Sequence, residues 1–93
     1  MNVEHDPQGH RFFVEVAGGT AELAYAVVDA HTLDLLHTEV PHAAAGQGVG
    51  GKLAEATFDW ARAHDTRLIP SCPFVREWLE RHPERQDQLA PPR

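Results

Sequence analysis

The chain has 93 residues, of which 42% are hydrophobic and 24% are charged, a balance typical of one small globular domain and too apolar for a disordered segment. The formal net charge is -6 and the 8 lysines and arginines form no basic cluster, which argues against a nucleic-acid-binding protein. The single cysteine cannot form an internal disulfide, and no apolar run is long enough for a signal peptide or a membrane helix. We therefore expect a cytoplasmic protein with no membrane partner.

Both ends of the chain are polar and are expected to lie outside the folded domain. Residues 1–9 contain Pro7 and Gly9 and are predicted to form a flexible arm. Residues 85–93 contain two adjacent prolines and are predicted to be a frayed tail. The folded domain is then expected to span residues 10–84.

Three strands are predicted in the first half of this domain, joined by short turns. Apolar and polar residues alternate over residues 11–16 and 20–29, with the Gly18-Gly19 pair between the two segments. A third apolar segment, residues 32–40, stops at Pro41, because proline has no N–H for sheet pairing. Tight connections of this kind favour a mostly antiparallel sheet.

The second half of the domain combines helical and extended patterns. Apolar residues recur at helical spacing from Val49 to His64, which predicts a helix with one stripe packed on the sheet. Residues 66–71 indicate a fourth strand, and residues 74–81 a short helix that Pro83 ends. The predicted order βββ-α-β-α places the chain in the α/β (α+β) class, with a sheet of about four strands.

A glycine-rich run precedes the first predicted helix and suggests a phosphate-binding site. Backbone N–H groups at a helix start have no intrahelical partner, and glycine has no Cβ atom to keep a diphosphate away from them. A lysine directly after the glycines adds a positive charge. The predicted phosphate-binding residues are Gly46, Gln47, Gly48, Val49, Gly50, Gly51 and Lys52.

Three phosphate-binding signatures overlap in this run and imply different ligands. The glycines satisfy G-x-G-x-x-G, but residues 66–72 lack the acidic side chain that a dinucleotide-binding fold places after its second strand. They also satisfy G-x-x-x-x-G-K, but Leu53 stands where a P-loop has serine or threonine. The pyrophosphate loop of an acyl-coenzyme A-binding fold needs only backbone amides and a helix start. The context therefore favours coenzyme A over NAD and ATP.

Four short motifs, in this order along the chain, resemble those of the GNAT superfamily of N-acetyltransferases, and in particular its short single-domain members. Together they extend over most of the chain, roughly from Phe12 to Glu84. The motifs are His37-Thr38-Glu39-Val40-Pro41, Gly46-Gln47-Gly48-Val49-Gly50 at a helix start, Cys72-Pro73-Phe74-Val75, and His82-Pro83-Glu84.

The resemblance implies a splayed pair of strands that holds acetyl-coenzyme A. The main chain of Val40 would bind the pantetheine arm, the loop amides would bind the pyrophosphate, and Cys72 and Phe74 would lie beside the cofactor. Ala45 is a departure, because the superfamily usually carries arginine or glutamine at this position and gains a side-chain contact near the phosphates. The implied reaction is transfer of an acetyl group from acetyl-coenzyme A to an amine.

Three residues are the candidates for catalysis. Glu39 or His37 would accept the proton of the attacking amine, directly or through water, and alternation along a strand places both on the same face. Cys72 would protonate the departing thiolate, accept the acetyl group transiently, or simply be a small buried side chain. Tyr25, the single tyrosine, lies in mid-strand and is expected in the core.

Several alternatives remain open on sequence grounds. The seven histidines lack the spacing of metal ligands, so no metal site is predicted. The same fold could serve as a non-catalytic module that binds acyl-coenzyme A or a protein partner. The acceptor, a small-molecule or protein amine, is not identified. Because the chain is short, its acceptor site would be open, or would be completed by a second subunit in a homodimer or by a protein substrate.

Overall fold

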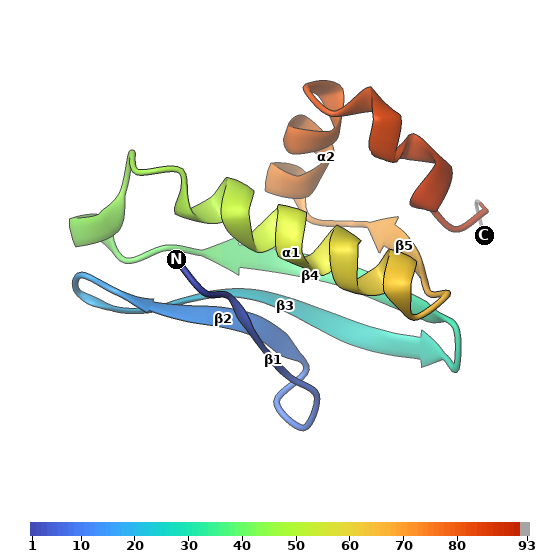
Figure 1. Ribbon diagram of the computed structural model, residues 1–93, viewed down its shortest axis with the longest axis horizontal. Coiled ribbons are helices and arrows are strands. Elements are labelled where there is room, and N and C mark those ends of the chain that lie inside the picture. Colours follow the sequence, from blue (N-terminus) through green and yellow to red (C-terminus); the bar gives the residue numbers. More distant parts are fainter. Residues whose placement is uncertain (92–93) are drawn as a thin grey trace.

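The computed structural model describes residues 1–91 of the chain and contains one five-stranded sheet, in the order β1-β2-β3-β4-β5 (Figure 1). Neighbouring strands are antiparallel except β4 and β5, which are parallel. The elements are β1 Glu4–Asp6, β2 Arg11–Val16, β3 Gly19–Asp29, β4 Thr32–Glu39, the 3-10 helix η1 His42–Ala44, α1 Val49–Ala63, β5 Arg67–Pro70, α2 Pro73–Glu80 and the 3-10 helix η2 Pro83–Gln88.

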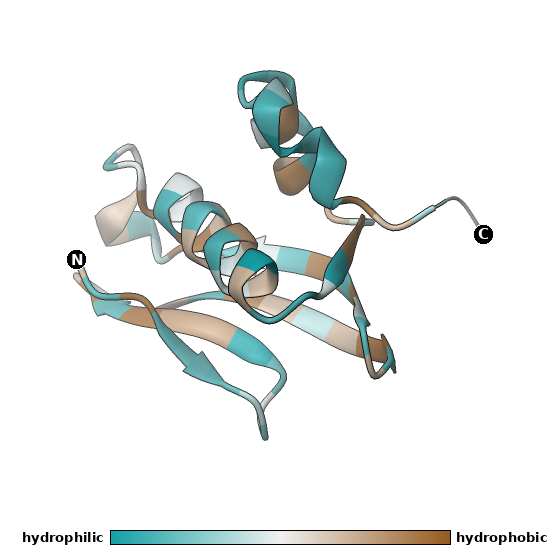
Figure 2. Cartoon of the chain, turned by 45° about the vertical axis from the view of Figure 1, so that its right-hand side comes forward, coloured by the Kyte–Doolittle hydropathy of each residue, from teal (hydrophilic) through white to brown (hydrophobic). Residues whose placement is uncertain are grey.

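The two α-helices lie on the same side of the sheet. Helix α1 packs on β2 and β3, whereas α2 packs on β4 and β5 (Figure 1). Hydrophilic and hydrophobic residues alternate along α1 (Figure 2), as expected for a helix with one face on a core. None of the helices within residues 1–91 is long and apolar enough to cross a membrane.

The core fills the space between the helices and the sheet. Apolar residues that alternate along β2, β3 and β4 meet the inner stripes of α1 and α2, and burial of their surface stabilises the fold. Phe58 in α1 is fully buried at the centre of this contact. The largest buried side chains are Phe58, Leu23, Leu35, Leu53, Leu68, Val49, Val75, Thr57 and Cys72.

The predicted fold class and element order are confirmed, but the sheet has one strand more than expected. Strand β1 pairs with β2 inside the segment that the sequence predicts to be a flexible arm. The His5 ring stacks on Phe12 with centroids 4.2 Å apart and meets Trp60 edge-on at 4.7 Å, and its Nε2 lies 2.7 Å from the hydroxyl oxygen of Tyr25. These contacts explain the pairing of a segment that has no alternating apolar pattern.

The C-terminal residues are also more ordered than the sequence predicts. Pro83 begins η2, and the buried Gln88 donates from Nε2 to the carbonyl oxygen of Phe58 at 2.7 Å. Leu89 then forms an isolated parallel bridge with Leu68, and the N–H of Ala90 donates to the Leu68 carbonyl oxygen at 2.8 Å. Residues 85–91 therefore pack against α1 and β5 instead of fraying, and residues 92–93 of the predicted tail lie outside the described part of the chain.

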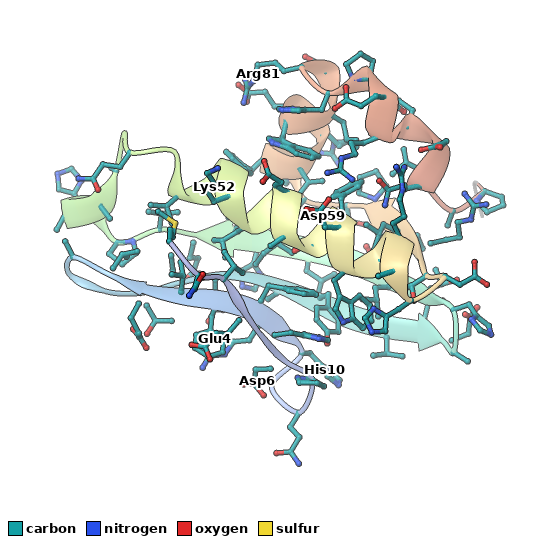
Figure 3. The ribbon with its side chains drawn as sticks, viewed as in Figure 1. Glu4, Asp6, His10, Lys52, Asp59 and Arg81 are labelled. Atoms are coloured by element: carbon teal, nitrogen blue, oxygen red, sulfur yellow. The ribbon has the colours of Figure 1, made fainter. Side chains whose placement is uncertain are left out.

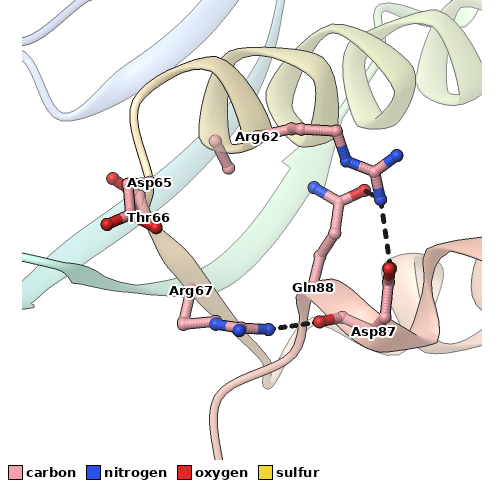
Figure 4. Close-up of a pocket in the computed structure, with 7 residues that line it drawn as sticks. Arg62, Asp65, Thr66, Arg67, Asp87 and Gln88 are labelled. Atoms are coloured by element: carbon pink, nitrogen blue, oxygen red, sulfur yellow. Dashed lines mark hydrogen bonds and ion pairs between the residues drawn. The ribbon is translucent and has the colours of Figure 1, made fainter.

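Two arginines form hydrogen bonds with this C-terminal segment. They line a small cavity of about 180 Å³ between the segment and the rest of the molecule (Figure 4). Arg62 in α1 donates to the Asp87 carboxylate at 3.0 Å and to the Gln88 side-chain oxygen at 3.1 Å. Arg67 in β5 donates to the main-chain oxygen of Asp87. Because the polar groups in the walls bind one another, we interpret this cavity as part of the packing of the C-terminal segment.

Candidate functional site

A bulge in β4 decides which of its side chains face the helices. Tyr25 of β3 pairs with Leu35 but Ala24 pairs with His37, so Leu36 is an extra residue between the two pairs. Before the bulge, Leu35 points into the core; after it, Thr38 pairs with the buried Leu23 and faces the helices. Without the bulge, His37 would have shared the inner face with Leu35.

A cleft of about 430 Å³ lies where β4 ends and α1 begins. It is bounded by the end of β4, the glycine-rich loop, the first turn of α1 and the two ends of α2. Its lining residues are Thr38, Val40, Ala44, Ala45, Gly46, Gly48, Val49, Gly50, Gly51, Phe74 and Arg81.

The start of α1 presents unprotected backbone to this cleft. Gly48 is the N-cap residue with φ +77°, a left-handed conformation that favours glycine, and no side chain caps the helix. The first i to i-4 hydrogen bond runs from the N–H of Lys52 to the carbonyl oxygen of Gly48 at 3.1 Å. The N–H groups of Val49, Gly50 and Gly51 therefore have no partner within the helix, and the helix dipole adds partial positive charge beside them.

The space next to two of these glycines is open. A Cβ atom on Gly46 or Gly48 would meet no atom within 4 Å, so the main chain there is uncovered. Gly50 differs, because a Cβ atom on it would lie 2.7 Å from Cζ of Phe74. Glycine at 50 thus allows α2 to approach α1 closely, and the Phe74 ring forms one wall of the cleft.

Two cationic side chains lie near the cleft. Arg81, at the end of α2, is among its lining residues and forms an ion pair with Glu77 one helical turn earlier, at 3.5 Å. Lys52 is exposed on the first turns of α1 but does not line the cleft; Figure 3 labels both cations. Among residues 1–91, only Arg81 therefore adds a formal positive charge to the cleft wall, and it is a residue that sequence reasoning missed.

Most of the predicted cofactor-binding residues line this cleft. These are Val40, Gly46, Gly48, Val49, Gly50, Gly51 and Phe74, whereas Gln47, Lys52 and Cys72 are not part of the wall. The residues that sequence reasoning missed are Thr38, Ala44, Ala45 and Arg81. Thr38 and Ala45 lie within the motifs already recognised, but Arg81 carries no local signal, because only the approach of α2 to the loop brings it there.

Cys72 lies at the join between β5 and α2, directly behind the cleft wall. Its side chain is 2% exposed, and its Sγ atom is 3.5 Å from Oγ1 of Thr38. Its N–H donates to the carbonyl oxygen of Leu35 at 2.8 Å, which continues the pairing of β4 with the chain that follows β5. Helix α2 begins at the next residue, Pro73, so the pairing with β4 stops here, and Thr38 lies beside the point where it stops.

His37 and Glu39 share a face of the sheet, as predicted, but it is the face opposite to Thr38. They pair with Ala24 and Glu22 of β3, and Nε2 of His37 is 3.8 Å from a carboxylate oxygen of Glu22. The structure therefore brings Cys72 to the cleft-lining Thr38 but does not bring it to His37 or Glu39. The candidate proton acceptors and the candidate thiol therefore lie on opposite sides of the sheet.

The fold agrees with comparisons to known proteins. Residues 11–88 match the family model of the GCN5-related N-acetyl-transferases, and the chain belongs to this family. A GCN5-like protein from Staphylococcus aureus, solved by NMR, has a similar structure with a TM-score of 0.74 and 29% sequence identity over 99% of this chain and 90% of that one. The resemblance found in the sequence is thus confirmed.

Curated relatives carry the name Protein NATD1. The protein from Xenopus tropicalis is 34% identical over 85 residues, which cover 89% of this chain and 78% of the relative. The Homo sapiens protein is 33% identical over the same number of residues, covering 89% of this chain and 75% of the relative. Membership of an acetyltransferase family and a small single-domain fold are therefore established for the chain.

Proposed function

We propose that the protein binds acetyl-coenzyme A in the cleft at the start of α1 and transfers the acetyl group to an amine. The uncapped first turn of α1 carries this proposal, because its backbone N–H groups face a cleft where glycines leave the main chain bare. The pyrophosphate would bind to the amides of residues 48–51, and Arg81 would add a charge-assisted contact. Val40, at the end of β4, would bind the pantetheine arm through its main chain.

The location of Thr38 and Cys72 fits a reaction at the splayed strands. Bound acetyl-coenzyme A would supply the acetyl group as a thioester. An amine that attacks from the opposite face of the sheet would pass its proton to His37 or Glu39, which lie on that face. The new bond joins the amine nitrogen to the acetyl carbon, the thioester C–S bond breaks, and the departing thiolate takes up a proton.

Two measurements test this proposal in sequence. Calorimetry should detect binding of acetyl-coenzyme A and coenzyme A but not of NAD or ATP, because β5 carries no acidic residue and Leu53 replaces the magnesium-binding hydroxyl of a P-loop. Release of free thiol over a panel of small amines, polyamines and peptides then tests catalysis. Equal binding of NAD would contradict the proposed ligand.

A non-catalytic module that binds acyl-coenzyme A is the second candidate. The observation that favours it is the nature of the cleft wall, in which Arg81 is the only ionisable side chain that the described residues contribute. Binding of acetyl-coenzyme A without release of thiol on any acceptor would support this module, whereas turnover on one acceptor would exclude it.

A further inference from the structure

A further cavity lies on the face of the sheet that the two α-helices leave uncovered, and Asp34 is one of its lining residues. Asp34 is in the middle of β4, between Ala26 of β3 and Ile69 of β5. Its sequence neighbours Leu33 and Leu35 are buried on the helix side, so alternation places Asp34 on the other side. Aspartate is unfavourable in a central strand, and nothing in the sheet pairing requires it there.

One oxygen of the Asp34 carboxylate lacks the partner that a buried acceptor normally has. Its Oδ1 atom is buried and has no hydrogen-bond partner within residues 1–91, and no ion pair to Asp34 is found in the same part of the chain. Buried polar atoms in proteins are nearly always satisfied, so an orphaned acceptor calls for a partner.

The neighbouring cations are engaged elsewhere. Nη1 of Arg76 donates to the carbonyl oxygens of Pro70 and Ser71, at 3.2 and 2.7 Å, and Arg67 donates to the main chain of Asp87. Neither of these two arginines therefore pairs with the Asp34 carboxylate.

The shape and chemistry of the cavity limit which kind of cation could pair with Asp34. Its volume is about 380 Å³, and apart from Asp34 and Ser71 its walls are apolar: Ile69, Pro70, Leu89, Ala90 and Pro91. No group of three histidine, cysteine or acidic residues within residues 1–91 could hold a metal ion. One carboxylate beside apolar walls instead matches a cation on an aliphatic chain, whose methylene groups pack on the walls while its charged end is paired.

We propose that this cavity binds the ammonium group of a primary alkylamine, with Asp34 as its counter-ion. The proposal does not depend on acetyl transfer, and binding alone tests it. Titration with butylammonium chloride, followed by amide chemical shifts, should move the signals of Asp34, Ile69, Ser71 and Ala90. Butanol, which has the same chain without the charge, should move them far less. Equal responses to both compounds, or responses confined to other residues, would overturn the proposal.

Two variants, each of which removes one negative charge, distinguish binding at this site from general electrostatic attraction to the protein. Asp34→Asn should weaken butylammonium binding by about tenfold or more, the loss expected for a charge-assisted hydrogen bond. Glu55→Gln removes one negative charge from the exposed side of α1, far from the cavity, and should leave the affinity unchanged. Wild-type affinity in a folded Asp34→Asn protein would refute the site, and if that variant does not fold, the comparison of butylammonium with butanol decides.

The source of the amine is resolved by comparing a free diamine with a lysine side chain. Diaminobutane and lysine blocked at both backbone ends present the same ammonium chemistry, and the one that saturates the cavity at lower concentration identifies the source. Blocked lysine that is also acetylated on Nζ should not bind, because it has lost its charge. Failure of both amines, or equal binding of the acetylated form, would overturn the proposal.

Discussion

Gly50 of α1 and the Phe74 ring of α2 are packed so closely that a Cβ atom on Gly50 would lie 2.7 Å from Cζ of Phe74. We expect Gly50→Ala to displace the ring into the cleft that it lines and to weaken binding of coenzyme A by about tenfold or more. Calorimetry with coenzyme A measures the loss.

The adjacent Gly51 provides the matched control for this substitution. A Cβ atom there would meet the Trp78 ring at 3.8 Å, an ordinary contact, so Gly51→Ala should fit. Alanine should raise helix stability by about 1 kcal/mol, whereas overpacking at position 50 should leave that variant roughly 1–3 kcal/mol less stable than Gly51→Ala. Equal unfolding free energies in urea would contradict the close approach of the two helices.

A second prediction concerns the proton acceptor. Replacing the residue that acts as base, by His37→Gln or Glu39→Gln, should lower kcat by about 10²-fold while the affinity for coenzyme A stays unchanged, because both residues face away from the cleft. Glu55→Gln is again the control for loss of charge. Full activity in both variants would assign the role to another group or to solvent.

A third prediction separates the possible roles of Cys72. The residue is 2% exposed and its Sγ atom lies beside Thr38, so we expect no acetyl-cysteine intermediate. Intact mass spectra of the protein mixed with acetyl-coenzyme A should show no acetyl adduct. Cys72→Ala should cost about 1 kcal/mol of stability through lost burial and should retain part of the activity. An adduct that disappears in the alanine variant would establish the covalent route instead.

The fourth prediction is a pH dependence of stability that originates at β1. Burial, followed by the positive charge of His64, lowers the pKa of His5 below its ordinary value of 6.5. Below about pH 6.5 the unfolded chain therefore binds more protons at this position than the folded chain, so the free energy of unfolding falls as the pH falls through this range. Above it, both states are neutral at His5 and the effect vanishes.

Urea unfolding on either side of this pH range tests the assignment to His5. His5→Gln cannot titrate and should flatten the dependence, whereas His31→Gln, at an exposed turn, should retain it. An unchanged slope in His5→Gln would show that another group is responsible.

Sequence reasoning predicted the parts of the fold that depend on local patterns. The alternation in β2 and β3, the helical stripe of α1 and the glycines before it are all visible in short windows. The proposal that the loop binds phosphate rests on the same residues, because bare amides at a helix start are a local property.

What could not be predicted depends on contacts between distant segments. Glu4–Asp6 becomes a strand because His5 packs against rings from β2, β3 and α1, which no window of a few residues contains. The bulge at Leu36 has no signal in the sequence either, yet because of it Thr38 faces the helices and His37 does not. Arg81 reaches the cleft only through the packing of α2 on α1.

The hydrogen bonds of Gln88 to Phe58 and of Ala90 to Leu68 have a practical consequence for handling this protein. A shortened chain that stops at residue 84 would leave two buried carbonyl groups without these donors and would remove Asp87, to which Arg62 and Arg67 donate. Labels and fusion partners at the carboxyl end should therefore follow the last residue through a linker, so that the bridge between Leu68 and Leu89 can still form.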